Sequence, residues 1–132
     1  MINNQIEQFL QSSAFAVVGA SSNRAKYGNK VLRCYLQHGK TVYPVNPQDE
    51  LIEGLPVQHS ISDLPDEVDS ISIITPPEVT EKIVAAAIQK GIKNIWMQPG
   101  AESDAAIQNG KVHGLNIIAR GPCILVYMGF HE

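Results

Sequence analysis

Short apolar runs alternate with amphipathic stretches along the chain. Residues 15–18 form a continuous apolar run typical of a buried strand, and Tyr27, Val31 and Tyr35 then recur every four residues, as on one face of a helix. Four later runs favour strands, at residues 41–45, 70–74, 94–97 and 115–119. Three further stretches have helical spacing, at residues 3–11, 77–90 and 102–110. The pattern therefore predicts about five strands that alternate with helices.

Two parts of the chain are less regular. Residues 48–65 contain Gly54, Pro56 and Pro65, and they predict a connecting excursion with a small strand or a helical turn near residues 60–64. Residues 123–128 are an apolar run whose pattern favours neither helix nor strand.

Strands that alternate with helices form parallel sheets that are covered on both faces. We predict one α/β domain over residues 1–132 with a Rossmann-like fold, a parallel sheet of about five strands with helices on both faces. Right-handed crossovers favour the strand order 3-2-1-4-5. Ligands of such sheets bind beyond the carboxyl ends of the strands, so the candidate binding loops begin near Gly19, Asn46, Thr75 and Gln98.

Composition narrows the classes of function. With 132 residues, of which 44% are hydrophobic, the chain is typical of one globular domain with a normal core. A net charge of −3 argues against nucleic acid or a membrane surface as the main partner, and no apolar run reaches the roughly 20 residues that span a bilayer. The first residues lack a signal-peptide pattern, and Cys34 and Cys123 form no metal or redox motif. We therefore expect a cytoplasmic protein with reduced thiols.

The run Gly19-Ala20-Ser21-Ser22 joins the first predicted strand to the first predicted helix. Such a loop directs free backbone N–H groups and the positive end of a helix dipole at one point, where phosphate binds. It is not the dinucleotide fingerprint G-x-G-x-x-G, because Ser21 and Arg24 stand where the second and third glycines would be. Arg24 or Lys26 would supply positive charge. An ordinary strand–helix loop without a ligand is the alternative.

The end of the second predicted strand also differs from an NAD site. A Rossmann domain that binds NAD usually carries Asp or Glu there, to hold the ribose hydroxyls. Here Asn46 and Pro47 occupy that position, and the first acid, Asp49, comes later. Together with the missing glycines, this departure argues against NAD(P).

Four segments together resemble a known family: residues 19–31 (GASSNRAKYGNKV), 43–47 (YPVNP), 74–79 (ITPPEV) and 95–100 (IWMQPG). In this order they resemble the small stand-alone CoA-binding proteins, which are similar to the CoA-binding domain of the succinyl-CoA synthetase alpha subunit. The resemblance runs from about residue 15 to residue 128. It implies a Rossmann-like fold and coenzyme A as the ligand. It also implies that residues 19–22 and nearby basic residues hold the phosphates, and that Asn46-Pro47 and Thr75-Pro76-Pro77 line the adenosine and pantetheine region.

The chemistry of coenzyme A agrees with this assignment. Its diphosphate and its 3′-phosphate require a helix N-terminus and one or two cations. Arg24 and Lys26 are the favoured cations, because Lys30 lies several residues into the helix and is expected to be solvated. The prolines of the binding loops would form rigid apolar walls, although turn or helix-start chemistry explains each one singly. Gln98, after the fourth strand, is placed to reach the ligand.

We propose no catalytic residue from the sequence. None of the four histidines lies beside a nucleophile or a carboxylate at a catalytic spacing, and no serine lies in G-x-S-x-G. The synthetase relatives need a further domain with a phosphorylated histidine, and we expect none in a chain that ends at Glu132. Cys123 could lie near the ligand and meet its thiol, although a small buried cysteine is the simpler interpretation.

The sequence thus predicts a module that binds CoA or acyl-CoA without catalytic activity of its own, with no assigned protein partner. The alternatives are an acyl-CoA-dependent enzyme that uses Cys123, an NAD(P)-binding Rossmann domain, and an interaction protein with a vestigial pocket.

Overall fold

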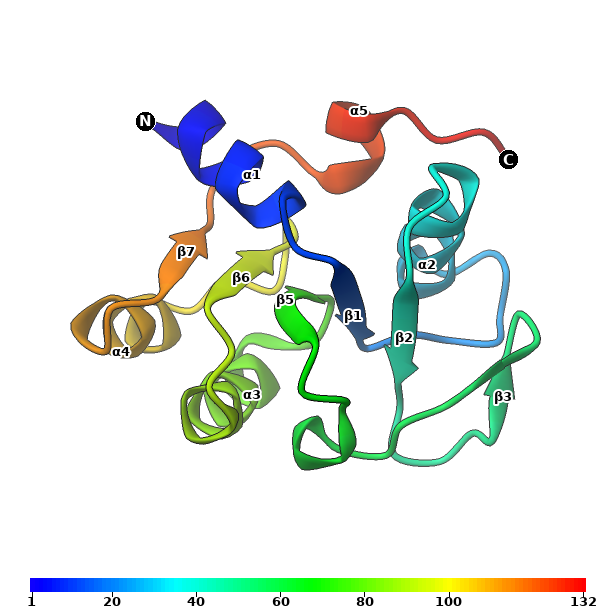
Figure 1. Cartoon of the computed structure of the whole chain (residues 1–132), viewed down its shortest axis with the longest axis horizontal. Coiled ribbons are helices and arrows are strands. Elements are labelled where there is room, and N and C mark those ends of the chain that lie inside the picture. The colour runs from blue at the N-terminus through cyan, green and yellow to red at the C-terminus, as the bar shows by residue number, and fades with distance from the viewer.

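The computed structural model describes all 132 residues, and a parallel sheet lies at its centre (Figure 1). The five strands of this sheet are β1 (Ala14–Val18), β2 (Val42–Val45), β5 (Val68–Ile73), β6 (Asn94–Met97) and β7 (Asn116–Ile118). They run in the order β2-β1-β5-β6-β7, and every neighbouring pair is parallel. The predicted Rossmann-like α/β fold is confirmed.

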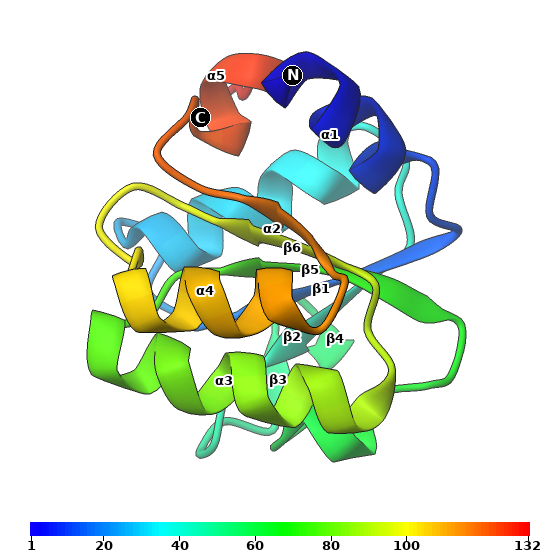
Figure 2. The same ribbon diagram turned by 90° about the vertical axis from the view of Figure 1, so that its left-hand side faces the viewer.

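Helices cover both faces of the sheet (Figure 2). On one face lie α1 (Ile2–Leu10), α2 (Tyr27–Gln37) and α5 (Ile124–Met128), and on the other lie α3 (Pro77–Lys90) and α4 (Asp104–Val112). The irregular excursion contains a hairpin of β3 (Leu51–Ile52) and β4 (Leu55–Pro56), followed by the 3₁₀ turn η1 (Ile61–Asp63). The apolar run near the end of the chain, which the pattern left open, is the helix α5.

β1 lies inside the sheet and is buried along its whole length. Its large side chains, Phe15 and Val17, pack on the α2 side, where the ring of Tyr35 stacks on Phe15 with 5.0 Å between centroids. Ala16 and Val18 belong to the core on the α3 side. A strand covered on both faces has no polar side to expose, which explains its continuous apolar run.

The strand order differs from the predicted 3-2-1-4-5. The third strand of the sheet, β5, pairs with β1 on the side opposite β2, so the order is 2-1-3-4-5. Both orders satisfy right-handed crossovers, so that rule alone did not decide between them. Residues 46–67 carry the chain back past β1, with η1 packed against α3, and deliver β5 on the far side. The switch point of the sheet consequently lies between β1 and β5.

Candidate ligand-binding site

The chain turns sharply where β1 ends, at Gly19. This residue has a φ of +94°, and its N–H donates to the carbonyl of Val45 at 3.2 Å. A Cβ on Gly19 would stand 1.9 Å from the carbonyl oxygen of Ile74, the residue after β5. Only glycine fits this backbone conformation and this approach. The carboxyl ends of β1, β2 and β5 therefore meet at one residue, at the switch point.

Gly28, the second residue of α2, brings the start of this helix onto the same turn. A Cβ on Gly28 would stand 2.1 Å from the carbonyl oxygen of Gly19. Close packing of helix on strand is the task of the third glycine in the dinucleotide fingerprint. In this protein Gly28 follows a longer loop, so it does not match the spacing of the dinucleotide fingerprint.

A cleft of about 420 Å³ opens over this turn. It is lined by Gly19, Ala20, Ser21, Lys26, Tyr27, Gly28, Asn46, Ile74, Thr75 and Pro76. The backbone N–H groups of Ser21, Ser22, Tyr27 and Gly28 donate to no acceptor within the protein. They belong to the loop and to the first turn of α2, where the helix dipole is positive. The arrangement suits an anion such as a phosphate group.

Asn46, at the tip of β2, forms one wall of the cleft. Its Nδ2 donates to the carbonyl of Ala20 at 2.9 Å, and its Oδ1 accepts from the N–H groups of Gln48 (2.7 Å) and Asp49 (3.1 Å). The side chain thus ties the loop after β2 to the glycine loop. Both polar atoms of the Asn46 side chain are hydrogen bonded within the protein. Asn46 therefore shapes the wall by fixing the backbone of these two loops.

An apolar slot of about 280 Å³ adjoins the cleft and shares Gly19 and Thr75 with it. Its other lining residues are Val18, Val45, Pro47, His59, Ser60, Ile61, Val79, Ile83 and Ala86. Apart from Thr75, only His59 and Ser60 offer polar side chains. A slot with aliphatic walls and few polar groups suits a flat, weakly polar ring.

A third cavity, of about 390 Å³, adjoins the cleft on its other side. It is lined by Tyr27, Ile74, Thr75, Pro76, Pro99, Gly100 and Ala101. Thr75 thus borders all three cavities, and its hydroxyl hydrogen bonds to that of Thr80 in α3 at 2.7 Å. Pro76 is the N-cap of α3 and Pro77 its first residue, so this turn also starts the helix.

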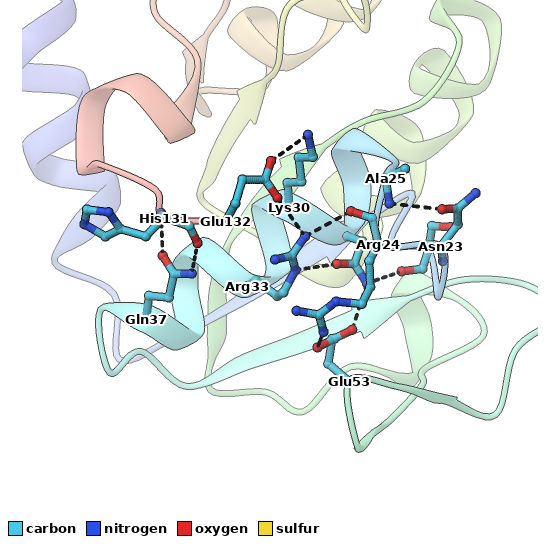
Figure 3. A network of polar contacts seen from close by, with 11 residues as sticks. Asn23, Arg24, Ala25, Lys30, Arg33, Gln37, Glu53, His131 and Glu132 are labelled. Carbon is cyan, nitrogen blue, oxygen red and sulfur yellow. Dashed lines mark hydrogen bonds and ion pairs between the residues drawn. The ribbon is translucent and has the colours of Figure 1, made fainter.

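The basic residues of the loop and of α2 differ in whether they line the cleft and whether they are in ion pairs. Lys26 lines the cleft and makes no ion pair. Arg24 borders none of the three cavities, and its Nη1 lies 2.5 Å from Oε1 of Glu53 in the β3–β4 turn (Figure 3). Lys30 was expected to be solvated, but its Nζ instead pairs with the Glu132 carboxylate at 2.9 Å.

Gln98, after β6, is buried and lines none of these cavities. Its Oε1 accepts from the Tyr27 hydroxyl (3.0 Å) and from the Ile124 N–H (2.9 Å), whereas its Nε2 has no acceptor.

Burial and the neighbouring thiol of Cys123 raise the pKa of Tyr27 above its ordinary value. Burial raises the pKa of the Cys34 thiol to about 11.

The structure brings most of the predicted binding residues together. Those that line the cleft or the slot are Gly19, Ala20, Ser21, Lys26, Asn46, Pro47, Thr75 and Pro76. Those that do not are Ser22, Arg24, Pro77 and Gln98. Sequence reasoning did not select Tyr27, Gly28, His59 and Ser60 as lining residues. Tyr27 and Gly28 lie directly after the loop, which was the available signal; nothing local in the sequence marks His59 or Ser60.

No three histidine, cysteine or acidic side chains gather where they would hold a metal ion. No helix has both the length and the apolar character needed to cross a membrane.

The sheet order, the glycine turn and the cleft define a Rossmann-like α/β domain with a ligand cleft at its switch point. The chain belongs to the CoA-binding domain family, whose model matches residues 13–129. This agrees with the resemblance that the four sequence segments carry.

Known relatives fall into two groups. The chain is 34% identical over 114 residues to an ADP-forming acetate–CoA ligase II of Archaeoglobus fulgidus, a match that covers 77% of this chain and 17% of that protein. It is 30% identical over 91 residues to the alpha subunit of an ADP-forming acetate–CoA ligase II of Pyrococcus furiosus, covering 68% and 20%. The chain therefore spans about a fifth of the length of these curated relatives.

Solved structures of small proteins match over most of both chains. A conserved hypothetical protein of Pyrococcus furiosus is 41% identical with a TM-score of 0.82, and the match covers 86% of this chain and 97% of that one. A hypothetical protein of Pyrococcus horikoshii is 31% identical with a TM-score of 0.88, covering 96% and 88%.

Proposed function

We propose that this protein binds coenzyme A or an acyl-CoA across the cleft at the switch point, as a binding module without catalytic activity of its own. The observation that carries the proposal is the pairing of two unlike cavities at Gly19. One offers free N–H groups, the start of α2 and Lys26, and the other is an apolar slot. Coenzyme A combines phosphates with an adenine ring, so it needs both.

The three adjoining cavities suit the three parts of the ligand. In the proposed arrangement the diphosphate lies over residues 19–22 and the first turn of α2, near Lys26. The adenine lies in the slot between Pro47 and Val79, and the pantetheine arm leads past Pro76 toward Tyr27. Family membership supports the same ligand.

The alternative with a specific observation behind it is an acyl-CoA-dependent enzyme. Cys123 is half-buried, and its thiol lies beside the hydroxyl of Tyr27, a residue that lines the cleft. In such an enzyme the Cys123 thiolate would attack the thioester carbonyl, a new C–S bond to the cysteine would form, and CoA would leave as a thiolate. The ligase relatives are CoA ligases by name, but only about a fifth of their length corresponds to this chain.

Calorimetric titration with CoA, acetyl-CoA and NAD tests the binding proposal. We expect CoA to bind more tightly than NAD, because no acid stands at the tip of β2 and the Asn46 carboxamide is engaged. Tighter binding of NAD would overturn the proposal. Native mass spectrometry of freshly purified protein gives an independent check, since a retained mass identifies the ligand directly.

Thiol release from acetyl-CoA and succinyl-CoA tests the proposal that the protein has no catalytic activity of its own. A binding module should release free thiol no faster than buffer does. Steady release that is lost in Cys123→Ser, with CoA binding intact, would replace the module with an acyl-transfer or hydrolase function.

A further inference from the structure

The β3–β4 turn holds a residue in an unfavourable backbone conformation. Glu53 has a φ of +52° and is followed by Gly54 with a φ of +78°. Glycine, Asn or Asp is the usual choice at a left-handed turn position, because a longer side chain is strained there. Ile52, directly before Glu53, is 1% exposed and anchors the hairpin in the core beside α2. A strained Glu on an anchored turn points to a use for its carboxylate.

The Glu53 carboxylate bridges two residues of the glycine loop region. Its Oε2 accepts from Nδ2 of Asn29 at 3.1 Å, and its Oε1 meets Nη1 of Arg24 at 2.5 Å (Figure 3). The Glu53 side chain is 18% exposed, whereas that of Arg24 is 62% exposed. The hydrogen bond from Asn29, helped by Arg24, holds the pKa of Glu53 below its usual range.

Asn29 and Arg33 of α2 hold the backbone of the loop. The Asn29 side chain is fully buried, donates to the carbonyl of Ser21 at 2.8 Å and accepts from Nε of Arg33 at 2.7 Å. Arg33 in turn donates to the carbonyl of Arg24 at 3.0 Å. The loop backbone is therefore fixed from inside the protein. The contact that remains exposed and replaceable is the one between the side chains of Arg24 and Glu53.

Two carboxylates, those of Glu53 and Glu132, are already paired with most of the cations in this region. Three of the four cations are paired: Arg24 with Glu53, and Lys30 and Arg33 with Glu132. Lys26 alone is free to meet the diphosphate. If Lys26 binds the diphosphate, none of the other three cations is free to meet a 3′-phosphate unless its ion pair opens. The Arg24 pair is the most exposed on its cationic side.

We propose that Glu53 is a specificity-determining residue that competes with the 3′-phosphate of the ligand for the Arg24 guanidinium. This inference rests on the proposed function. While Arg24 is held by Glu53, ligands with and without a 3′-phosphate differ little in affinity. When Arg24 leaves Glu53 for the phosphate, binding of the phosphorylated ligand is favoured. Glu53 thus sets the size of the preference for CoA over dephospho-CoA.

The test is a calorimetric comparison of CoA and dephospho-CoA, which differ by the 3′-phosphate alone, in wild type and Glu53→Gln. The glutamine amide oxygen still accepts from Asn29, but the charge that holds Arg24 is gone. We expect Glu53→Gln to tighten CoA by about threefold, the size of one exposed ion pair, and to change dephospho-CoA by less. In an Arg24→Ala background the same substitution should have no selective effect.

Glu50→Gln is the matched control, because it removes one charge from the same excursion while its carboxylate faces His59 at 3.7 Å rather than Arg24. Equal tightening by both substitutions would mean a general charge effect and would overturn the inference. So would equal weakening of both ligands in Glu53→Gln, which would mean that Glu53 only supports the loop. If CoA binds and the preference does not change, this inference fails and the proposed function stands. If wild type binds neither ligand, both fail.

A second measurement follows the guanidinium directly. The ¹⁵N NMR signal of Arg24 Nε, assigned with Arg24→Lys, should shift when CoA is added and stay in place when dephospho-CoA is added. A signal that ignores both ligands, while calorimetry detects binding, would overturn the exchange.

Discussion

The carbonyl oxygen of Ile74 occupies the space that a side chain on Gly19 would need, 1.9 Å from the ideal Cβ position. The two residues follow β1 and β5, the strands on either side of the switch point. Both residues line the cleft, and the glycine loop begins where the backbone of Gly19 packs directly against this carbonyl. The conformation of the glycine loop therefore depends on how closely β1 and β5 pack together.

Gly19→Ala should destabilise the protein by about 3 kcal/mol or more, because strain at a φ of +94° adds to a clash with backbone. Urea unfolding measures this directly. Gly39→Ala is the control: its φ is +71°, but nothing lies within 4 Å of the added Cβ. We expect it to cost about 1 kcal/mol, the strain alone. Equal costs for the two variants would mean that the Ile74 contact relaxes freely.

Ala86→Leu should weaken CoA binding by about tenfold or more, because the longer side chain enters the apolar slot proposed for adenine. Ala85→Leu is the matched control, since Ala85 is exposed on the same helix and lines no cavity. Calorimetry on both variants, with thermal unfolding to confirm the fold, makes the comparison. If the two bind CoA alike, the adenine does not lie in the slot.

Lys26→Ala should weaken CoA and dephospho-CoA to the same extent, by about tenfold, since a charge-assisted hydrogen bond contributes about 1.5–3 kcal/mol. The reason is its position at the cleft beside the first turn of α2, where the diphosphate is proposed. Lys30→Ala should change neither affinity, because Lys30 pairs with Glu132 instead. Selective loss of CoA binding in Lys26→Ala would move Lys26 to the 3′-phosphate.

The sequence was informative where one local pattern decides the structure. The five strands, the four longer helices and the loop at Gly19 all follow from hydrophobic period and glycine position. The strand order did not, because it depends on which side of β1 the long excursion of residues 46–67 returns, and no local pattern records that.

The candidate site divides in the same way. Gly19, Lys26 and Thr75 belong to loops that follow strands, so topology brings them to one edge. The partner of Arg24 was out of reach of sequence reasoning, because Glu53 lies in a separate hairpin that meets the loop only in three dimensions. The prediction that Arg24 binds a phosphate therefore could not include the carboxylate of the same chain that is paired with its guanidinium.

Acid should remove the contribution of Glu53 to stability. Its pKa in the folded protein lies below the ordinary 4.5, so the charged form is favoured by folding. The stabilisation is present above pH 4.5 and is lost as the pH falls through the lower, folded-state value. Urea unfolding of wild type and Glu53→Gln from pH 7 to pH 3 should show a stability difference that shrinks toward acid. A difference that is constant with pH would contradict the assignment.

The two cysteines should differ in reactivity. Cys34 is fully buried and its thiol pKa is about 11, so at pH 8 only about one thiol in a thousand is ionised. Cys123 is half-buried. Iodoacetamide at pH 8 should therefore modify Cys123 in the native protein and leave Cys34 untouched, whereas both should react in urea. Peptide mapping by mass spectrometry locates the label, and modification of native Cys34 would contradict the burial.

The same label reports where the thiol end of the ligand lies. If the pantetheine arm leads past Pro76 to Tyr27, it ends beside Cys123, because that thiol is a neighbour of the Tyr27 hydroxyl. Saturating acetyl-CoA should then slow the alkylation of Cys123 several-fold. ADP is the control, since it carries the adenine and a diphosphate but has no arm, and should leave the rate unchanged. Equal protection by both would instead mean that binding closes the site as a whole, and no protection by acetyl-CoA at saturation would direct the arm away from Tyr27.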